Sequence, residues 1–322
     1  MIMKKSGGFI RFFELFTAIL MFIGTAPRAD AAEVIKVGTV GATIGAFDAA
    51  VYEGEFETAG LSVEKIVFSS GVDAIAALVS DSIDLFIGSY EHVLRQIDKG
   101  LDVKAFALIS NTQGYKLITR TDSPYQSLAD LKGKAVGVTK VGSLSDTVLR
   151  KTIAEAGLNP DRDIEIINGG TGSTMVGALE SGNIAAGMIF EPLSSELLGS
   201  GKYRLLHYAD YETAGLVIMG TEKWVASHAG EFRSFLDVIR KENLKVSKAP
   251  GDFARLFSKD FPGLSDDILT QAIANTLARS PSDLVISDAA AEDVLNGQLE
   301  RDLISRKIEK SEAVDGSYLP KD

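Results

Sequence analysis

The sequence predicts an α/β fold made of two similar lobes with a cleft between them. Short apolar segments alternate with amphipathic segments from Val34 to about Tyr208, a pattern typical of sheets covered by helices. The same order of segments occurs twice along this stretch. From Trp224 onward the pattern becomes nearly all helical, with proline and glycine between the segments.

The first 31 residues predict an export signal. Lys4-Lys5 and Arg11 form a basic start, and a mostly apolar run from Phe12 to Ala26 follows. Ala29-Asp30-Ala31 supplies the small residues that a signal peptidase recognises, so we expect cleavage after Ala31. The alternative is a retained membrane anchor, but the run of about 15 residues is shorter than the roughly 20 that span a bilayer.

Composition excludes several kinds of protein. The absence of cysteine excludes disulfides, thiolate metal sites, a cysteine nucleophile and a lipid anchor on an N-terminal cysteine. Without residues 1–31, the 33 Lys and Arg become 29 and the 44 Asp and Glu become 42, a net charge of −13. An acidic chain of this kind argues against nucleic acid and anionic lipid as partners. Export without a lipid anchor predicts a protein free in a Gram-negative periplasm.

The alternating region divides into expected strands and helices. We expect strands at Val34–Val40, Ser62–Phe68, Leu85–Ile87, Val103–Ile109, Lys116–Arg120, Ala135–Thr139, Ile164–Ile167, Gly187–Ile189 and Tyr203–Tyr208. We expect helices around Phe47–Thr58, Asp73–Val79, Tyr90–Lys99, Leu144–Ala156 and Thr174–Glu180, and in the C-terminal region at Gly230–Val246, Asp252–Phe261, Ser265–Ala278 and Asp288–Ile304. The alternation predicts parallel sheets covered on both faces.

An internal repeat predicts the two lobes. Gly45–Leu61 (GAFDAAVYEGEFETAGL) aligns without a gap with Gly142–Leu158 (GSLSDTVLRKTIAEAGL) at an offset of 97 residues. Both copies end in Ala-Gly-Leu, where the glycine is a natural helix C-cap. Ala77–Asp84 and Ala178–Ala185 form a second pair at an offset of 101 residues. In open sheets ligands bind where strands lead into helices, so the loops of both lobes should face one cleft.

Four strand-to-helix loops are rich in glycine and hydroxyl side chains. They are Gly41–Gly45, Ser69–Gly71, Val141–Ser143 and Asn168–Ser173. Each opens a helix, whose first turn has unpaired N–H groups and a partial positive charge, which suits an anionic or strongly polar ligand. Ser143 with Asp146 also fits a capping box, so Ser143 is expected to cap its helix, to contact the ligand, or both.

Aromatic and acidic residues near these loops point to a different ligand chemistry. Phe47, Tyr90, Tyr115 and Phe190 either stack on a flat ligand or belong to the core. Glu191 either accepts hydrogen bonds from an amino group or faces solvent. These residues favour a heteroaromatic or amine-bearing ligand, whereas the loops favour an oxyanion, and the sequence leaves both open.

No pattern typical of catalysis occurs in the sequence. His92, His207 and His228 have no metal-binding spacing, and there is no G-x-S-x-G or G-x-x-x-x-G-K-[ST] motif. The loop Gly169–Ser173 lacks both the lysine and the G-x-G-x-x-G spacing of nucleotide-binding loops. These observations favour binding over catalysis, and we expect neither a metal nor a cofactor.

Three stretches resemble a known family. They are Gly54–Glu64, Ala77–Asp84 and Ser127–Val138, the last of which contains Ser-Leu-Ala-Asp-Leu-Lys-Gly-Lys. Together they resemble the nitrate/sulfonate/taurine-type substrate-binding proteins of ABC importers, which are related to thiamine-pyrimidine-precursor binding proteins. The likeness covers roughly Val34 to Leu198. Ala185 departs from the acidic residue that the family usually has there, and the absence of cysteine argues against the activity of the related pyrimidine-forming enzymes.

The resemblance implies a class II periplasmic binding protein fold. Two α/β lobes are then joined by two crossovers, expected near Asn111–Lys116 and Tyr211–Val217, and the C-terminal helices pack on lobe one. We expect lobe one to comprise residues 32–114 and 216–322, and lobe two to comprise residues 115–215.

The resemblance also implies a function. A monomer captures a small organic anion, such as a sulfonate or taurine, and delivers it to an ABC permease and ATPase in the inner membrane. The resemblance implies ligand contacts at the loop residues Thr43, Ser70, Ser89, Gly142, Ser143, Thr171 and Glu191. The aromatic residues Phe47, Tyr90 and Tyr115 near these loops complete the expected ligand-binding set. The alternatives are a pyrimidine-like, aromatic carboxylate or nitrate ligand, a periplasmic enzyme on the same fold, and a receptor for a membrane sensor.

Overall fold

The computed structural model describes residues 33–112, 114–208 and 212–321. The export signal expected in residues 1–31 lies outside this part of the chain. No helix in the described ranges is both long and apolar enough to cross a membrane.

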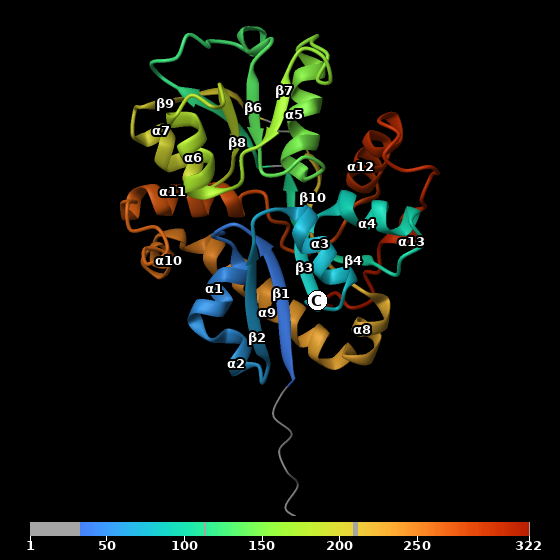
Figure 1. Cartoon of the computed structure of the whole chain (residues 1–322). Coiled ribbons are helices and arrows are strands. Elements are labelled where there is room, and N and C mark those ends of the chain that lie inside the picture. Colours follow the sequence, from blue (N-terminus) through green and yellow to red (C-terminus); the bar gives the residue numbers. More distant parts are fainter. Residues whose placement is uncertain (1–32, 113, 209–211, 322) are drawn as a thin grey trace, which may run out of the picture. The chain divides into compact units, whose positions relative to one another are not determined.

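Two five-stranded sheets form the framework (Figure 1). Sheet A has the order β2-β1-β3-β10-β4, and sheet B has the order β7-β6-β8-β5-β9. Sheet A contains β1 (Val34–Val40), β2 (Ser62–Phe68), β3 (Leu85–Ser89), β4 (Lys104–Thr112) and β10 (Glu212–Gly220). Sheet B contains β5 (Lys116–Arg120), β6 (Ala135–Val138), β7 (Glu165–Asn168), β8 (Ala186–Ile189) and β9 (Tyr203–Tyr208).

The two sheets have the same pairing pattern, which confirms the two-lobe repeat. In each, three neighbouring strands are parallel and the fourth, β10 or β5, is antiparallel to both of its neighbours. The expectation of parallel sheets was therefore wrong for these two strands. The chain passes into β5 from β4 of the other sheet, and into β10 from β9 of the other sheet, with no helix between the two strands. A parallel strand needs a crossover connection, usually a helix, and the local pattern of strands and helices does not show where one is missing.

Helices α1 to α7 flank the two sheets. On the side of sheet A they are α1 (Ala46–Glu53), α2 (Glu55–Thr58), α3 (Gly71–Val79) and α4 (Tyr90–Asp98). On the side of sheet B they are α5 (Leu144–Glu155), α6 (Gly172–Glu180) and α7 (Leu193–Gly199), with a short 3₁₀ turn at Leu128–Leu131. The single helix expected at Phe47–Thr58 is broken at Gly54, whose φ of 70° caps α1 in the left-handed conformation.

Six further helices follow β10 along the chain. They are α8 (Glu222–Ser227), α9 (Ala229–Lys248), α10 (Pro250–Phe257), α11 (Asp266–Leu277), α12 (Asp288–Glu300) and α13 (Lys310–Ala313). Helix α9 packs on α1 and α2, and the ring of Phe235 stacks on that of Phe56 with centroids 5.0 Å apart. A buried phenylalanine of this kind contributes about 1.5–3 kcal/mol.

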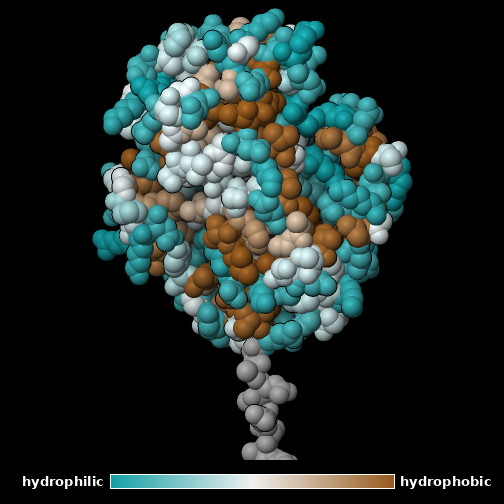
Figure 2. All heavy atoms as spheres, in the orientation of Figure 1, coloured by the Kyte–Doolittle hydropathy of each residue, from teal (hydrophilic) through white to brown (hydrophobic). Residues whose placement is uncertain are grey.

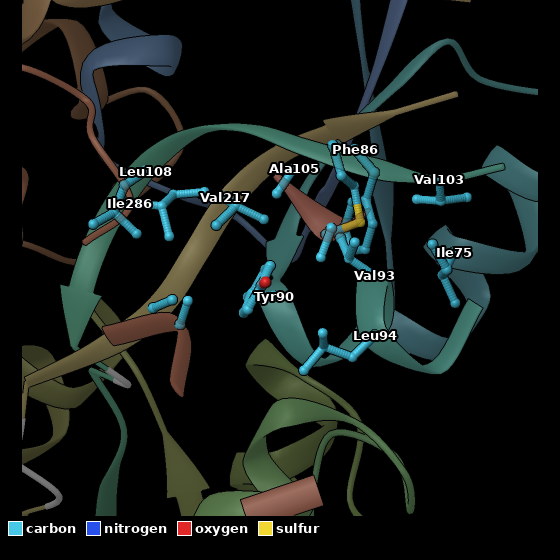
Figure 3. Close-up of a cluster of buried hydrophobic side chains, with 14 of the residues drawn as sticks. Ile75, Phe86, Tyr90, Val93, Leu94, Val103, Ala105, Leu108, Val217 and Ile286 are labelled. Carbon is cyan, nitrogen blue, oxygen red and sulfur yellow. The ribbon is translucent and has the colours of Figure 1, made fainter. Parts of the chain in front are cut away.

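The region around α12 also joins the core of lobe one. Ile286, just before α12, packs with Leu108 and Val217 of sheet A (Figure 3), and Ala290 and Ala291 continue the same cluster. These contacts confirm that C-terminal helices pack on lobe one.

Strand β10 was missed from the sequence. The expected crossover Tyr211–Val217 starts outside the described residues, and from Glu212 the chain is already in sheet A, where Glu212 pairs with Thr112. Val217, Ile218 and Met219 are all fully buried in the middle of the sheet. Because both faces of this strand are covered, its apolar run lacks the alternation that marks a half-exposed strand.

Candidate ligand-binding site

A cavity of about 300 Å³ lies between the two sheets. Its wall on the side of sheet A comes from β1, β3, β4 and the first turn of α1. On the side of sheet B it comes from β5, β9, the residues that follow β8 and the first turn of α5. Helices α9 and α11 complete the wall. The volume is at the lower end of the range usual for small-molecule sites. On the face shown in Figure 2, hydrophobic residues gather near the middle, and hydrophilic residues dominate the periphery.

Six of the ten expected ligand-binding residues line this cavity. On the side of sheet A they are Thr43 and Phe47 at the start of α1 and Ser89 at the end of β3. On the side of sheet B they are Tyr115 before β5, Ser143 at the N-cap of α5 and Glu191 after β8. The structure therefore brings together residues from both halves of the repeat. Their contact with a ligand stays a prediction.

The other four expected residues lie outside the lining. Ser70 caps α3, where its hydroxyl accepts from the Asp73 N–H at 3.2 Å. Tyr90 lies in the core of lobe one, 1% exposed (Figure 3). Thr171 is the N-cap residue of α6. Gly142, with a φ of 89°, precedes Ser143, and its carbonyl accepts a hydrogen bond from Arg95.

Three helices have their N-cap residue in the cavity lining. Their N-cap residues are Gly45 for α1, Ser89 for α4 and Ser143 for α5. Neither serine hydroxyl makes a capping hydrogen bond, and the Gly45 N–H donates to the Asp48 carboxylate at 2.9 Å. Ser143 is thus the N-cap residue of α5, as one interpretation of the sequence expected, but its hydroxyl makes no capping hydrogen bond. Asp146 accepts instead from the N–H of Gly142 at 2.8 Å. The partial positive charge of three first turns is thus directed at one space.

Several buried polar atoms at the cavity have no hydrogen-bond partner among the described residues. They are the hydroxyl oxygens of Thr39, Thr112 and Ser143 and the side-chain oxygen of Asn243. All four residues are less than 9% exposed. A buried polar atom without a partner costs about 1–3 kcal/mol, so a bound group that satisfies it is favoured. A hydroxyl turns about one bond, which lets a threonine or serine present its proton to a ligand.

The carboxylates of the lining are paired with lysines. Glu191 Oε1 lies 2.5 Å from Lys116 Nζ, and the two side chains are only 12% and 13% exposed. Asp48 lies 2.6 Å from Lys65 Nζ and accepts from the hydroxyl of Thr43 at 2.8 Å. One interpretation of the sequence placed Glu191 in solvent, and the structure shows instead that it is largely buried. Both negative charges are compensated, so neither opposes an anion strongly.

Two ionisable aromatic groups at the cavity, His92 and Tyr115, are uncharged near neutral pH. Burial, together with the charges of Arg95 and Lys99, lowers the pKa of His92 to about 3. Burial raises the pKa of the Tyr115 hydroxyl well above its usual range. The Tyr115 ring packs edge-on against Phe190, with centroids 5.5 Å apart. These side chains give the cavity apolar surface without charge.

Sequence reasoning missed the contribution of the C-terminal helices and two cationic groups. Residues of α9, α11 and the segment that follows it line the cavity: Ile239, Asn243, Asn275, Thr276, Arg279, Ser280 and Leu284. Lys116 and Arg279 flank the ring of Tyr208, with their charged groups 5.6 and 4.7 Å from its centroid. No motif marks these positions, although polar residues on the inner face of an amphipathic helix are a usable signal.

The cavity contains no cluster of metal ligands among the residues that the structure describes. The one group of three acidic side chains close enough to share an ion is Glu53, Glu55 and Glu242, which lies on α1, α2 and α9 and outside the lining. The ammonium of Lys245 pairs with all three carboxylates. The Lys245 ammonium thus occupies the place that a metal ion would take between these carboxylates.

Comparison with known proteins gives relatives that span most of the chain. A Bacillus subtilis (strain 168) protein named as an aliphatic sulfonates-binding protein is 27% identical over 279 residues, which cover 84% of this chain and 81% of that protein. A solved protein from Bordetella bronchiseptica RB50 has a TM-score of 0.76 at 23% identity and covers 88% of this chain and 95% of its own. The alkanesulfonate-binding protein SsuA from Xanthomonas axonopodis pv. citri, solved with MOPS, has a TM-score of 0.72 at 18% identity, with coverage of 87% and 97%.

The structural similarities confirm the periplasmic binding protein fold, with two α/β lobes. The family model described as NMT1/THI5 like matches residues 44–251, which include the repeat, both crossovers and most of the cavity wall. The chain therefore belongs to the NMT1/THI5-like family.

Proposed function

We propose that this protein is the periplasmic substrate-binding component of an ABC importer and that its ligand is a small organic anion, a sulfonate first among them. The observation that carries the proposal is the convergence of three helix N-termini, from both lobes, on one cavity. Such termini bind oxyanions through free N–H groups and a partial positive charge. The relatives named for binding sulfonates support the same class of ligand.

The rest of the cavity favours an organic anion over an inorganic one. Phe47, Phe86, Leu144, Phe190 and Ile239 provide a largely apolar wall. An alkyl or aryl group would be desolvated there, which contributes about 25 cal/mol per Å² of apolar surface. Nitrate has no such group and would leave most of the space unused. A sulfonate with an alkyl or aryl body fits both the polar and the apolar parts of the wall.

Capture follows from the placement of the site between lobes. Because β10 pairs in sheet A from Glu212, the proposed lobe one comprises residues 32–114 and 212–322, four residues more than the sequence suggested, and the proposed lobe two comprises residues 115–211. A ligand that contacts both lobes binds the closed arrangement better than the open one and shifts the population toward it. The closed form then docks on a membrane permease, which an ATPase drives. The proposed location is the periplasm, in line with the export signal expected in residues 1–31.

A thermal-shift screen of residues 32–322 tests this proposal. The panel contains alkane- and arenesulfonates, taurine, nitrate, aminopyrimidines and aromatic carboxylates. Saturation at one hundred times Kd adds about 2.7 kcal/mol, which raises the Tm of a chain of this size by roughly 4–5 °C. The expected result is a rise with sulfonates. A rise only with aminopyrimidines would overturn the anion assignment.

Turnover distinguishes binding from catalysis. The ligand that raises the Tm is incubated with the protein and followed by mass spectrometry. We expect the ligand to be recovered unchanged, because the lining combines compensated carboxylates and a neutral histidine, and its described residues include no cluster of three metal ligands. A new product that depends on the protein would establish the enzyme alternative.

A further inference from the structure

One arginine connects the two lobes beside the cavity. Arg95 lies on α4, which packs on sheet A, and its Nη1 donates to the carbonyl of Gly142 at 2.6 Å. Gly142 belongs to the loop that opens α5 on sheet B and directly precedes Ser143. The Arg95 side chain is 15% exposed. A charge-assisted hydrogen bond of this length in a partly buried place is among the stronger polar contacts between lobes.

Arg95 is held rigidly on its own side. Its Nε donates to Gln298 Oε1 on α12 at 2.7 Å, and its Nη2 lies 3.5 Å from Glu91 Oε1 on the same helix. Gln298 in turn donates to Glu91 Oε2 at 3.3 Å. Glu91 is only 1% exposed. The guanidinium is thus oriented by lobe one before it reaches lobe two, so little side-chain freedom is lost when the contact forms.

A second contact holds the same loop. Lys140 Nζ lies 2.6 Å from Asp73 Oδ1 on α3. Asp73 also accepts from the hydroxyl of Ser70 at 2.7 Å, which fixes the carboxylate. The loop from Lys140 to Ser143 is therefore joined to lobe one at both ends. The pKa of Asp73 lies below its usual range because Lys140 and Ser70 bond to it, so the carboxylate is ionised at neutral pH.

We propose that Arg95 is a positioning residue of the ligand site, acting through the Gly142 carbonyl. By fastening the 140–143 loop to α4, it sets the distance between the N-termini of α4 and α5 and holds Ser143 at the cavity. The contact exists only while the lobes are together, so it slows their separation and lengthens the residence time of the ligand. This inference rests on the proposed function in placing the ligand between the lobes.

The test compares Arg95→Gln with a matched control. Arg204→Gln also removes an arginine that donates to backbone carbonyls, those of Thr121, Ser123 and Tyr125, but all of its partners belong to the side of sheet B. Stopped-flow binding of the alkanesulfonate that raises the Tm most gives the association and dissociation rates. We expect Arg95→Gln to raise the dissociation rate about tenfold or more, with an association rate within about twofold of the wild type. Arg204→Gln leaves both rates unchanged, and Arg95→Lys restores part of the loss.

A second readout needs no ligand. The chain has no cysteine, so Glu57→Cys on α2 and Lys134→Cys beside β6 place one spin label in each lobe. Pulsed electron–electron distance measurements should show longer and broader distances when Arg95→Gln is added. If Arg95→Gln does not fold, Lys140→Ala provides a second test. It removes the half-exposed cation that pairs with Asp73 and leaves buried Glu91 untouched, and it should lengthen the distances in the same direction.

The outcomes separate the two proposals. If no sulfonate binds but Arg95→Gln lengthens the distances, the sulfonate assignment fails and the role of Arg95 in holding the lobes stands. If sulfonates bind and Arg95→Gln changes neither the dissociation rate nor the distances, Arg95 is not a positioning residue. An equal effect of Arg204→Gln would show that the change is a general loss of stability.

Discussion

Removal of the Ser143 hydroxyl should weaken ligand binding without destabilising the protein. Ser143 is 2% exposed, and its hydroxyl oxygen has no hydrogen-bond partner in the described part of the chain. Ser143→Ala removes a polar atom that the folded protein leaves unsatisfied, so the free energy of unfolding should stay the same or rise. A lost hydrogen bond to a charged ligand group costs about 1.5–3 kcal/mol. The Kd for a sulfonate should therefore rise roughly 10- to 150-fold.

The neighbouring Ser145 provides the matched control. Its hydroxyl oxygen accepts from the N–H of Thr139 at 2.9 Å, and the residue is fully buried. Ser145→Ala leaves that N–H without its partner, which costs about 1–3 kcal/mol of stability. Ser145 is not itself part of the cavity lining, but it bonds to Thr139, which is, so the Kd should rise much less in Ser145→Ala than in Ser143→Ala.

The assay pairs urea unfolding, followed by circular dichroism, with calorimetric titration of the sulfonate that binds wild type. Ser143→Ala should bind the sulfonate more weakly with unchanged or higher stability, whereas Ser145→Ala should be less stable and bind closer to the wild type. The reasoning is refuted if Ser143→Ala binds as tightly as wild type. It is refuted equally if Ser143→Ala destabilises the fold as much as Ser145→Ala does, because the hydroxyl would then be a structural group.

Three further perturbations test the charge, the pH dependence and the backbone of the site region. Glu191→Gln leaves Lys116 uncompensated at the cavity, so affinity for an anion should rise several-fold in titration while stability falls by about 3–5 kcal/mol. Because the pKa of His92 is lowered to about 3 in the fold, its contribution to stability is present above its unfolded pKa of about 6.5 and is lost as the pH falls toward 3. Stability should therefore fall by up to about 1.4 kcal/mol per pH unit more steeply in the wild type than in His92→Gln between pH 6 and 5, measured by urea unfolding. Gly215→Ala should destabilise strongly, because its Cβ would lie 2.0 Å from a carbonyl oxygen of β4, whereas Gly177→Ala in α6, with no atom within 4 Å, should stabilise by about 0.5–1 kcal/mol.

Each of these has a contrary result. A lower anion affinity in Glu191→Gln would mean that this carboxylate accepts from an amine on the ligand. Parallel pH curves for wild type and His92→Gln would mean that His92 is charged in the fold. Equal stability of the two glycine variants would mean that β10 and β4 separate enough to admit a methyl group.

The sequence predicted most strands because their patterns are local. Val34–Val40, Ser62–Phe68, Lys116–Arg120 and Tyr203–Tyr208 have the expected bounds. The repeat predicted two lobes correctly, since a duplicated unit must form its own sheet. Gly54 was not expected to break its helix, because a single glycine is tolerated in many helices and only its φ of 70° shows the break.

The site was harder to predict than the fold. Ser143 and Glu191 lie in loops that carry glycine or follow an apolar strand, so the sequence pointed to them. Asn243 on α9 and Arg279 just after α11 lie 52 and 88 residues beyond Glu191, in a region without strands. They reach the cavity only because α9 and α11 fold back toward it, which is tertiary information that no local pattern contains.

The exchange of strands between the sheets has a consequence for folding. All five strands of sheet B lie between Lys116 and Tyr208, so this sheet can form from one continuous segment. Sheet A cannot be completed until β10 arrives, because β10 lies between β3 and β4, which precede the whole of sheet B in the chain. The part of the molecule that leaves the ribosome first must therefore wait for a later segment. We expect lobe two to gain hydrogen-exchange protection before lobe one during refolding, with β3 and β4 protected only when β10 is in place.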